Sequence, residues 1–330
     1  MIEPQSVPSS GKSLRLGAGL VIFSVLVTFP AWTAQRGEAP RRLENPADFT
    51  LPGKARVEFR NLQSPVLGKQ VQYSVFLPPN YDREPNQKFP VVYFLHGLHN
   101  NHTSWATQRY GDLPVRIEIL IDRGQLPHFV MIHPDGQNSL YTDSHDGNGN
   151  YESYIHHDLV QEVQQKYRVR IDRMGRAIGG VSMGGYGALK IAMRHPEFYA
   201  SVAATSPIVF LGEDPFSVLR SNPSRRSANF LRLVEQTFGN PTNKSHWKEN
   251  SLEELARNAA LNSLNIYFAY GTADRYNLIF PMERGIRSLE HILKQRGIAH
   301  VCRILKGKPH GWELVAAYLE ETLAFLTQTF

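Results

Sequence analysis

Short apolar runs alternate with segments of helical periodicity from about residue 70 to residue 330. The runs have the length and the β-branched or aromatic content of strands that are buried on both faces. They are residues 91–95, 129–133, 177–181, 202–205 and 265–270. Apolar side chains recur every third or fourth position in residues 155–167 and 314–326, which predicts amphipathic helices. The alternation predicts an α/β fold, with a mostly parallel central sheet and helices on both faces.

Two segments depart from this rhythm. Residues 71–77 alternate apolar and polar side chains, which predicts an antiparallel strand at an edge of the sheet. Residues 210–260 are polar and contain three prolines. An excursion that follows the carboxyl end of a strand lies over the ligand crevice in such a sheet, so this segment is a candidate lid or substrate wall. A surface excursion without a function is the alternative.

The N-terminal part of the chain carries the features of an export signal. Lys12 and Arg15 precede residues 16–34, a run of 19 residues without a charge. A bilayer span needs roughly 20 apolar residues, so membrane anchoring through an uncleaved segment is a second interpretation. Residues 1–34 are therefore expected to direct the protein to the periplasm or the medium. Residues 35–54, with their charges and prolines, are expected to be a flexible tether before a catalytic domain of residues 55–330.

Composition narrows the function classes. The 330 residues are 42% hydrophobic and 20% charged, as in an ordinary globular protein. The net charge of +6 comes from lysines and arginines scattered among acidic residues, so no nucleic-acid partner is expected. Cys302 is the one cysteine, which excludes a disulfide within these residues and a cysteine-based zinc site.

The segment that carries the chemistry is the G-x-S-x-G motif of residues 180–184, which follows a predicted strand and precedes a predicted helix. In the α/β-hydrolase fold this motif is a sharp turn that presents a serine above the sheet. Ser182 is the candidate nucleophile. The backbone amide of Met183, at the start of the helix, is a candidate donor to the oxyanion.

A serine hydroxyl needs a base, and the base needs a carboxylate that orients it. In this fold the three follow in the order serine, acid, histidine. Asp274 comes after the strand of residues 265–270, and His310 comes before the last helix. We therefore expect a triad of Ser182, Asp274 and His310. The alternative for Asp274 is an ordinary loop or helix-capping aspartate.

The second oxyanion donor is expected in the loop after the strand of residues 91–95. There His96-Gly97 is followed by Leu98, whose amide is the candidate. His96, His99 and His102 add a metal-site alternative, but no partners at a characteristic zinc spacing accompany them. Residues 143–152 offer oxygen ligands to calcium, yet they fail the EF-hand spacing and favour a turn. We expect neither a metal nor an organic cofactor.

Five segments resemble the putative esterase family of α/β-hydrolases, which includes S-formylglutathione hydrolases, feruloyl and acetylxylan esterases, enterochelin esterases and mycolyltransferases. They are LHGLHNNHTSW at 95–105, YTDS at 141–144, GGVSMGGYGALKIAMRHPEFY at 179–199, YGTADRYN at 270–277 and PHGW at 309–312. The resemblance implies an α/β-hydrolase fold. It also implies a triad of Ser182, Asp274 and His310, with the amides of Leu98 and Met183 as the oxyanion hole.

The function expected from these residues is an exported serine esterase that cleaves carboxylic esters through an acyl-serine intermediate. Its substrate is expected to be a small-molecule or carbohydrate-linked ester. An acyltransferase with the same triad, like the mycolyltransferases, is the first alternative. A non-catalytic exported binding protein and a membrane-anchored structural protein are the others.

Overall fold

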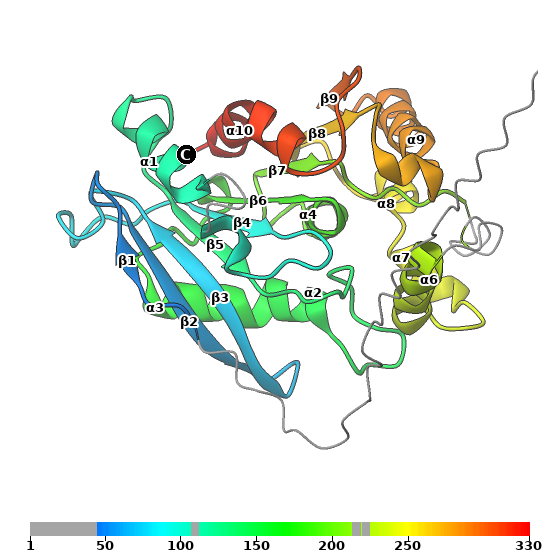
Figure 1. The fold of residues 1–330 in the computed structure, drawn as a ribbon, viewed down its shortest axis with the longest axis horizontal. Helices are drawn as coiled ribbons and strands as arrows, with labels where there is room; N and C mark the ends of the chain where they lie inside the picture. Colours follow the sequence, from blue (N-terminus) through cyan, green and yellow to red (C-terminus); the bar gives the residue numbers. More distant parts are fainter. Residues whose placement is uncertain (1–44, 107–111, 213–218, 220–224) are drawn as a thin grey trace, which may run out of the picture. The chain divides into compact units, whose positions relative to one another are not determined.

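The computed structural model describes residues 45–106, 112–212, 219 and 225–330 (Figure 1). Within them, nine strands form one sheet in the order β1-β2-β3-β5-β4-β6-β7-β8-β9. The strands are β1 (Phe49–Thr50), β2 (Arg56–Ser64), β3 (Lys69–Leu77), β4 (Val91–Leu95), β5 (Val130–Pro134), β6 (Arg176–Val181), β7 (Ser201–Thr205), β8 (Asn265–Gly271) and β9 (His300–Leu305). Pairing is parallel from β5 to β9 and antiparallel from β1 to β5. The α/β-hydrolase fold predicted from the sequence is confirmed.

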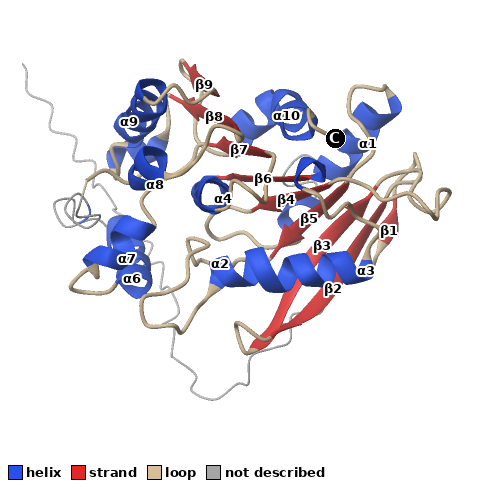
Figure 2. Cartoon of the chain, turned by 180° about the vertical axis from the view of Figure 1, so that it is seen from behind, coloured by secondary structure: helices blue, strands red, loops and turns tan. Residues whose placement is uncertain are grey.

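Helices cover both faces of the sheet (Figures 1 and 2). They are α1 (Leu113–Asp122), α2 (Tyr151–Ser153), α3 (Val160–Lys166), α4 (Met183–Arg194), α6 (Arg225–Phe238), α7 (Lys244–Glu249), α8 (Leu252–Asn258), α9 (Met282–Gln295) and α10 (Trp312–Thr327). A π-helical turn, Tyr154–Leu159, joins α2 to α3, so the helix expected over residues 155–167 is present.

Strand side chains point alternately into two hydrophobic cores. In β4, Val91, Tyr93 and Leu95 pack in the core that contains α3, α4, α8 and α9. Val92 and Phe94 pack in the other core, with α1 and α10. Because both faces of the central strands are buried, these strands read as continuous apolar runs, and the sequence predicted them well.

The prediction of an edge strand at residues 71–77 was wrong in its position. β3 does pair antiparallel, but it lies between β2 and β5, and β1 and β2 continue the sheet beyond it. β2 has the sequence RVEFRNLQS, whose five charged or amide side chains hide its buried Val57, Phe59 and Leu62.

The folded part also begins before residue 55. Residues 16–34 and the first part of the expected tether lie outside the described residues, but residues 45–54 are attached to the domain. Phe49 and Thr50 pair with β2, and the buried Glu118 of α1 accepts hydrogen bonds from the amides of Gly53 and Ala55, at 2.9 and 2.7 Å. Such fixation by a distant side chain leaves no periodic pattern in the sequence.

The described part of the excursion at residues 210–260 is helical. It contains α6, α7 and α8, and the buried Phe230, Val234 and Trp247 connect it to the core beside α4 and α9. None of the helices in the described part of the chain is both long and apolar enough to cross a bilayer. Cys302 lies half-buried in β9, the last strand of the sheet.

Candidate active site

Ser182 occupies the sharp turn between β6 and α4, with backbone angles φ 58° and ψ −116°. A residue with a side chain reaches such angles only under strain. The turn is held by close backbone packing: a Cβ atom on Gly180 would collide with the carbonyl of Gly184, and one on Gly184 would collide with the carbonyl of Leu95. The amide of Ser182 donates to the carbonyl of Thr205 in β7 at 2.8 Å. The two motif glycines are therefore needed by the packing of the turn.

The structure brings together the three residues expected to form the triad. Nε2 of His310 lies 3.0 Å from Oγ of Ser182, and Nδ1 of His310 lies 2.5 Å from Oδ2 of Asp274. These residues are 128 and 36 positions apart in the chain, so only the fold makes them neighbours. An ionised carboxylate can only accept a hydrogen bond, which places the proton of a neutral His310 on Nδ1 and leaves Nε2 free to accept from Ser182.

The loop after β8, which contains Asp274 and Tyr276, holds both Asp274 and His310 in place. Asp274 is 3% exposed, and its Oδ1 accepts from the amide of Tyr276 at 2.8 Å. The ring of Tyr276 packs edge-on against the imidazole of His310, with 4.5 Å between the ring centres. The carboxylate and the imidazole are thus held in one orientation. Sequence reasoning did not identify Tyr276, because an aromatic residue in a loop has no distinguishing pattern.

The loop after β4 lies against the turn that bears Ser182. A Cβ atom on Gly97 would lie 3.5 Å from Cβ of Ser182, and Leu98 lines the same cavity as Ser182 and His310. Met183 is the first residue of α4, so its amide has no acceptor within the helix, and its side chain is buried in the core. Both residues expected to supply oxyanion donors therefore adjoin the serine.

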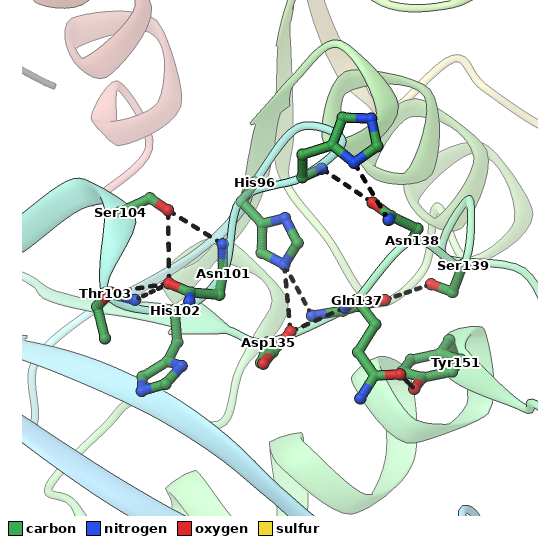
Figure 3. A network of polar contacts seen from close by, with 12 residues as sticks. His96, Asn101, His102, Thr103, Ser104, Asp135, Gln137, Asn138, Ser139 and Tyr151 are labelled. Carbon is green, nitrogen blue, oxygen red and sulfur yellow. Dashed lines mark hydrogen bonds and ion pairs between the residues drawn. The ribbon is translucent and has the colours of Figure 1, made fainter. Parts of the chain in front are cut away.

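A polar network behind this loop was not predicted from the sequence (Figure 3). His96 is fully buried, and its Nδ1 lies 2.8 Å from the carbonyl oxygen of Gly97 while its Nε2 accepts from the amide of Gly136 at 3.0 Å. Asp135 lies 3.6 Å from the same Nε2. Although burial opposes ionisation of Asp135, its neighbour His96 and a hydrogen bond from the amide of Gln137 lower its pKa. His96 thus connects the loop after β4 to the loop after β5.

Asn138 makes a second connection between these two loops. Its Oδ1 accepts from the amide of His99 at 2.9 Å, and His99 has the left-handed backbone angle φ 64°. Leu98 therefore lies between His96 and His99, and the loop after β5 holds both of these residues in place. A hint was present in the sequence, because Asp135-Gly136-Gln137-Asn138 follows a predicted strand at its carboxyl end, where ligand-binding residues gather.

The third histidine of the loop after β4 has a different role. Nε2 of His102 lies 3.0 Å from Oδ1 of Asn45, and burial lowers the pKa of His102 to about 4. Burial likewise lowers the pKa of its neighbour His133 to about 3, so both rings are neutral at ordinary pH. Among the residues that the structure describes, no group of three histidine, cysteine or acidic side chains could hold a metal ion.

The carboxylate oxygen atoms in the loop of residues 143–150 accept hydrogen bonds from nearby residues of the same segment. Asp146 accepts from Oγ of Ser144 at 2.7 Å and from the amide of Asn148 at 3.1 Å, while Asp143 accepts from the amide of Ser153 at 2.9 Å. The segment is a turn that leads into α2.

A buried ion pair supports α4 from behind. Nζ of Lys190 donates to the carbonyl of Tyr141 at 2.8 Å and to Oγ1 of Thr142 at 2.9 Å, and it pairs with Glu152 at 2.5 Å. Burial lowers the pKa of Lys190 to about 8. The helix that follows Ser182 is thereby fixed to the segment after β5.

Two cavities adjoin the serine. The first, of about 590 Å³, is lined by Ser182 and His310 together with Trp105 and Val315. The second, of about 580 Å³, is lined mainly by apolar side chains, among them Phe230 and Phe280. Four residues line both cavities: Leu98, His99, Arg275 and Tyr276. The second cavity therefore continues the first, and α6 forms part of its wall.

Comparison with known proteins agrees with this geometry. The family described as "Putative esterase" matches residues 64–324. An endo-1,4-beta-xylanase/feruloyl esterase of Xylanibacter ruminicola is 26% identical over 153 residues, which are 44% of this chain and 21% of that protein. The chain thus spans about a fifth of the length of this curated relative.

Solved structures are similar over most of the chain. A ferulic acid esterase is 26% identical, with a TM-score of 0.67 over 84% of this chain and 98% of its own. An S-formylglutathione hydrolase from Agrobacterium tumefaciens is 21% identical, with a TM-score of 0.66 over 86% of this chain and 98% of its own, a likeness of fold. Since the family match covers most of the sequence, the chain belongs to the Putative esterase family and has the α/β-hydrolase fold.

Proposed function

We propose that this protein is an exported serine esterase that cleaves carboxylic esters through an acyl-serine intermediate. The observation that carries the proposal is the unbroken set of contacts from Asp274 through His310 to Ser182, which ends in a cavity open to a substrate. A serine, a histidine and a buried carboxylate in this order of contact are the machinery of acyl transfer.

The first half-reaction follows from these contacts. Nε2 of His310 removes the proton of Ser182 as Oγ bonds to the ester carbonyl carbon, and the buried Asp274 stabilises the imidazolium that forms. His310 then gives the proton to the leaving alcohol as the carbon–oxygen bond breaks. In the second half-reaction His310 deprotonates a water molecule, which attacks the acyl-serine. His310 then returns the proton to Oγ of Ser182 as the bond between Oγ and the acyl carbon breaks and the acid leaves.

The negative charge that develops on the carbonyl oxygen needs donors at fixed positions. We assign this role to the amides of Leu98 and Met183. The amide of Met183 also lies at the positive end of the dipole of α4, which stabilises an anion further. The network of His96 and Asn138 positions Leu98.

We propose that the second cavity holds one part of the ester, with α6 as a substrate wall. Phe230 and Leu233 of α6 line it together with Ile279 and Phe280, so an apolar or aromatic group fits there. Because two of the similar proteins are named as feruloyl or ferulic acid esterases, hydroxycinnamoyl esters belong in the first substrate panel, beside short-chain and acetyl-sugar esters.

Replacing the nucleophile tests the mechanism. We expect Ser182→Ala to lower kcat for 4-nitrophenyl butyrate by at least about 10³-fold and to abolish covalent labelling by a fluorophosphonate, because no other group replaces the attacking oxygen. Ser245→Ala, on the exposed surface of α7, is the matched control. Wild-type turnover and labelling in the Ser182 variant would exclude the proposed mechanism.

Replacing the acid tests the orientation of the base. In Asp274→Asn the amide stabilises the wrong tautomer of His310, so kcat should fall by up to about 10⁴-fold with little change in KM. Asp214 also follows Ser182 in the sequence, within residues that the structure does not describe, and Asp214→Asn should change kcat far less. The assignment is wrong if the effects of these two substitutions are reversed.

Replacing Asn138 tests the positioning of the oxyanion loop. Asn138→Ala removes the acceptor for the amide of His99, so we expect kcat to fall about tenfold, less than for loss of a direct donor. A boronic acid inhibitor that mimics the tetrahedral intermediate should lose affinity by a similar factor. Asn138→Asp, which keeps an acceptor oxygen, should restore part of the loss, and Asn148→Ala is the control. Unchanged inhibitor affinity in Asn138→Ala would contradict this role.

Export is tested in the organism that makes the protein. Val25→Arg with Leu26→Arg places two charges in the apolar run at a cost of about 3 kcal/mol each, so this variant should stay in the cytoplasm. Glu38→Arg, outside the run, should be exported like the wild type. N-terminal sequencing of the exported protein decides between a cleaved signal and a retained anchor. Wild-type protein found only in the soluble cytoplasmic fraction would refute export.

A further inference from the structure

Arg275 lies close both to the residues of the triad and to the two cavities. It follows Asp274 directly, and it lines both the cavity that contains Ser182 and the cavity that continues it. Its guanidinium carbon lies 5.4 Å from the ring centre of Tyr276, and Tyr276 packs against His310. One aromatic ring therefore separates the arginine from the catalytic base.

The described lining of the two cavities offers no carboxylate to this arginine. Among the described residues that line them, none is an aspartate or glutamate, and Arg275 carries the one permanent charge. The nearest acid in the sequence, Asp274, is occupied by His310 and by the amide of Tyr276.

Several arginines elsewhere in the protein form ion pairs with carboxylates: Arg56, Arg60, Arg170, Arg287 and Arg303. For Arg275, no carboxylate in the described part of the chain lies within 4.0 Å. The guanidinium of Arg275 thus keeps its donors for another partner.

Beside the apolar walls, the surroundings of Arg275 also suit an anion. His99, Asn138 and Asn229 line the same second cavity and can donate hydrogen bonds, while its remaining walls are apolar. A planar guanidinium with free donors matches the two oxygens of a carboxylate. In a cavity with apolar walls, such a pair is weakened less by water than one on an open surface.

We propose that Arg275 selects ester substrates that carry a carboxylate near the scissile bond, as in the half-ester of a dicarboxylic acid or the ester of a hydroxy acid. This inference rests on the proposed esterase function of the same site and names its substrate class. Arg275 binds the free carboxylate while the ester carbonyl lies between Ser182 and the amides of Leu98 and Met183.

Matched substrates test the proposal on both sides of the ester bond. On the acyl side, mono-4-nitrophenyl glutarate is compared with 4-nitrophenyl pentanoate, which has the same chain length and leaving group but no charge. On the alcohol side, the butyryl ester of glycolate is compared with ethyl butyrate. We expect the full chain to prefer the charged member of at least one pair by about tenfold in kcat/KM, the low end for a charge-assisted hydrogen bond because Arg275 is partly in solvent. High salt should reduce this preference.

Variants assign the preference to one side chain. Arg275→Gln should lower the ratio of charged to neutral kcat/KM about tenfold, and Arg275→Lys should lower it less, since an ammonium keeps the charge but loses the planar pair of donors. Arg287→Gln, on the exposed face of α9, should leave the ratio unchanged. A full chain that hydrolyses the neutral esters with no preference in either pair, or a preference that survives Arg275→Gln, overturns the proposal. Failure to hydrolyse any ester would instead refute the proposed function.

Discussion

The close approach of three backbone segments at residues 95, 180 and 184 is the constraint on which the site depends. Because no side chain separates them, α4 begins directly above the end of β6, and Ser182 must take angles that a residue with a side chain otherwise avoids. The packed core around the turn stabilises this strained conformation of Ser182. Tyr186, Leu189 and Ile191 of α4 are fully buried, and Lys190 anchors the helix to the loop after β5.

The same constraint explains why the remaining parts of the site come from strand ends. The loops after β4, β5 and β8 all lie at the carboxyl edge of the parallel strands, next to Ser182. The loop after β5 holds the loop after β4 through His96 and Asn138, and the loop after β8 holds His310 through Asp274 and Tyr276. Leu98 and His310 are thus each supported by a second loop.

The sequence predicted those parts of the structure that repeat or that belong to a motif. The central strands and the closing helix were predicted correctly, and the three residues expected as a triad, Ser182, Asp274 and His310, lie within hydrogen-bonding distance of one another. Features that depend on contacts between distant residues were missed or misplaced. β2 was overlooked because polar side chains mask its buried positions, and residues 45–54 were assigned to the tether because their attachment to Glu118 leaves no local signal. The supporting roles of Asn138 and Tyr276 likewise depend on partners that the sequence does not reveal.

The burial of Cys302 bears on the redox conditions under which the protein can be stable. Burial in β9 raises the pKa of its thiol to about 12, so almost none of it is the reactive thiolate near neutral pH. With a single, poorly reactive cysteine, these 330 residues can neither form a wrong disulfide within one chain nor readily form one between two chains. The domain therefore needs no thiol oxidant or disulfide isomerase, and its stability should be the same in reducing and in oxidising compartments.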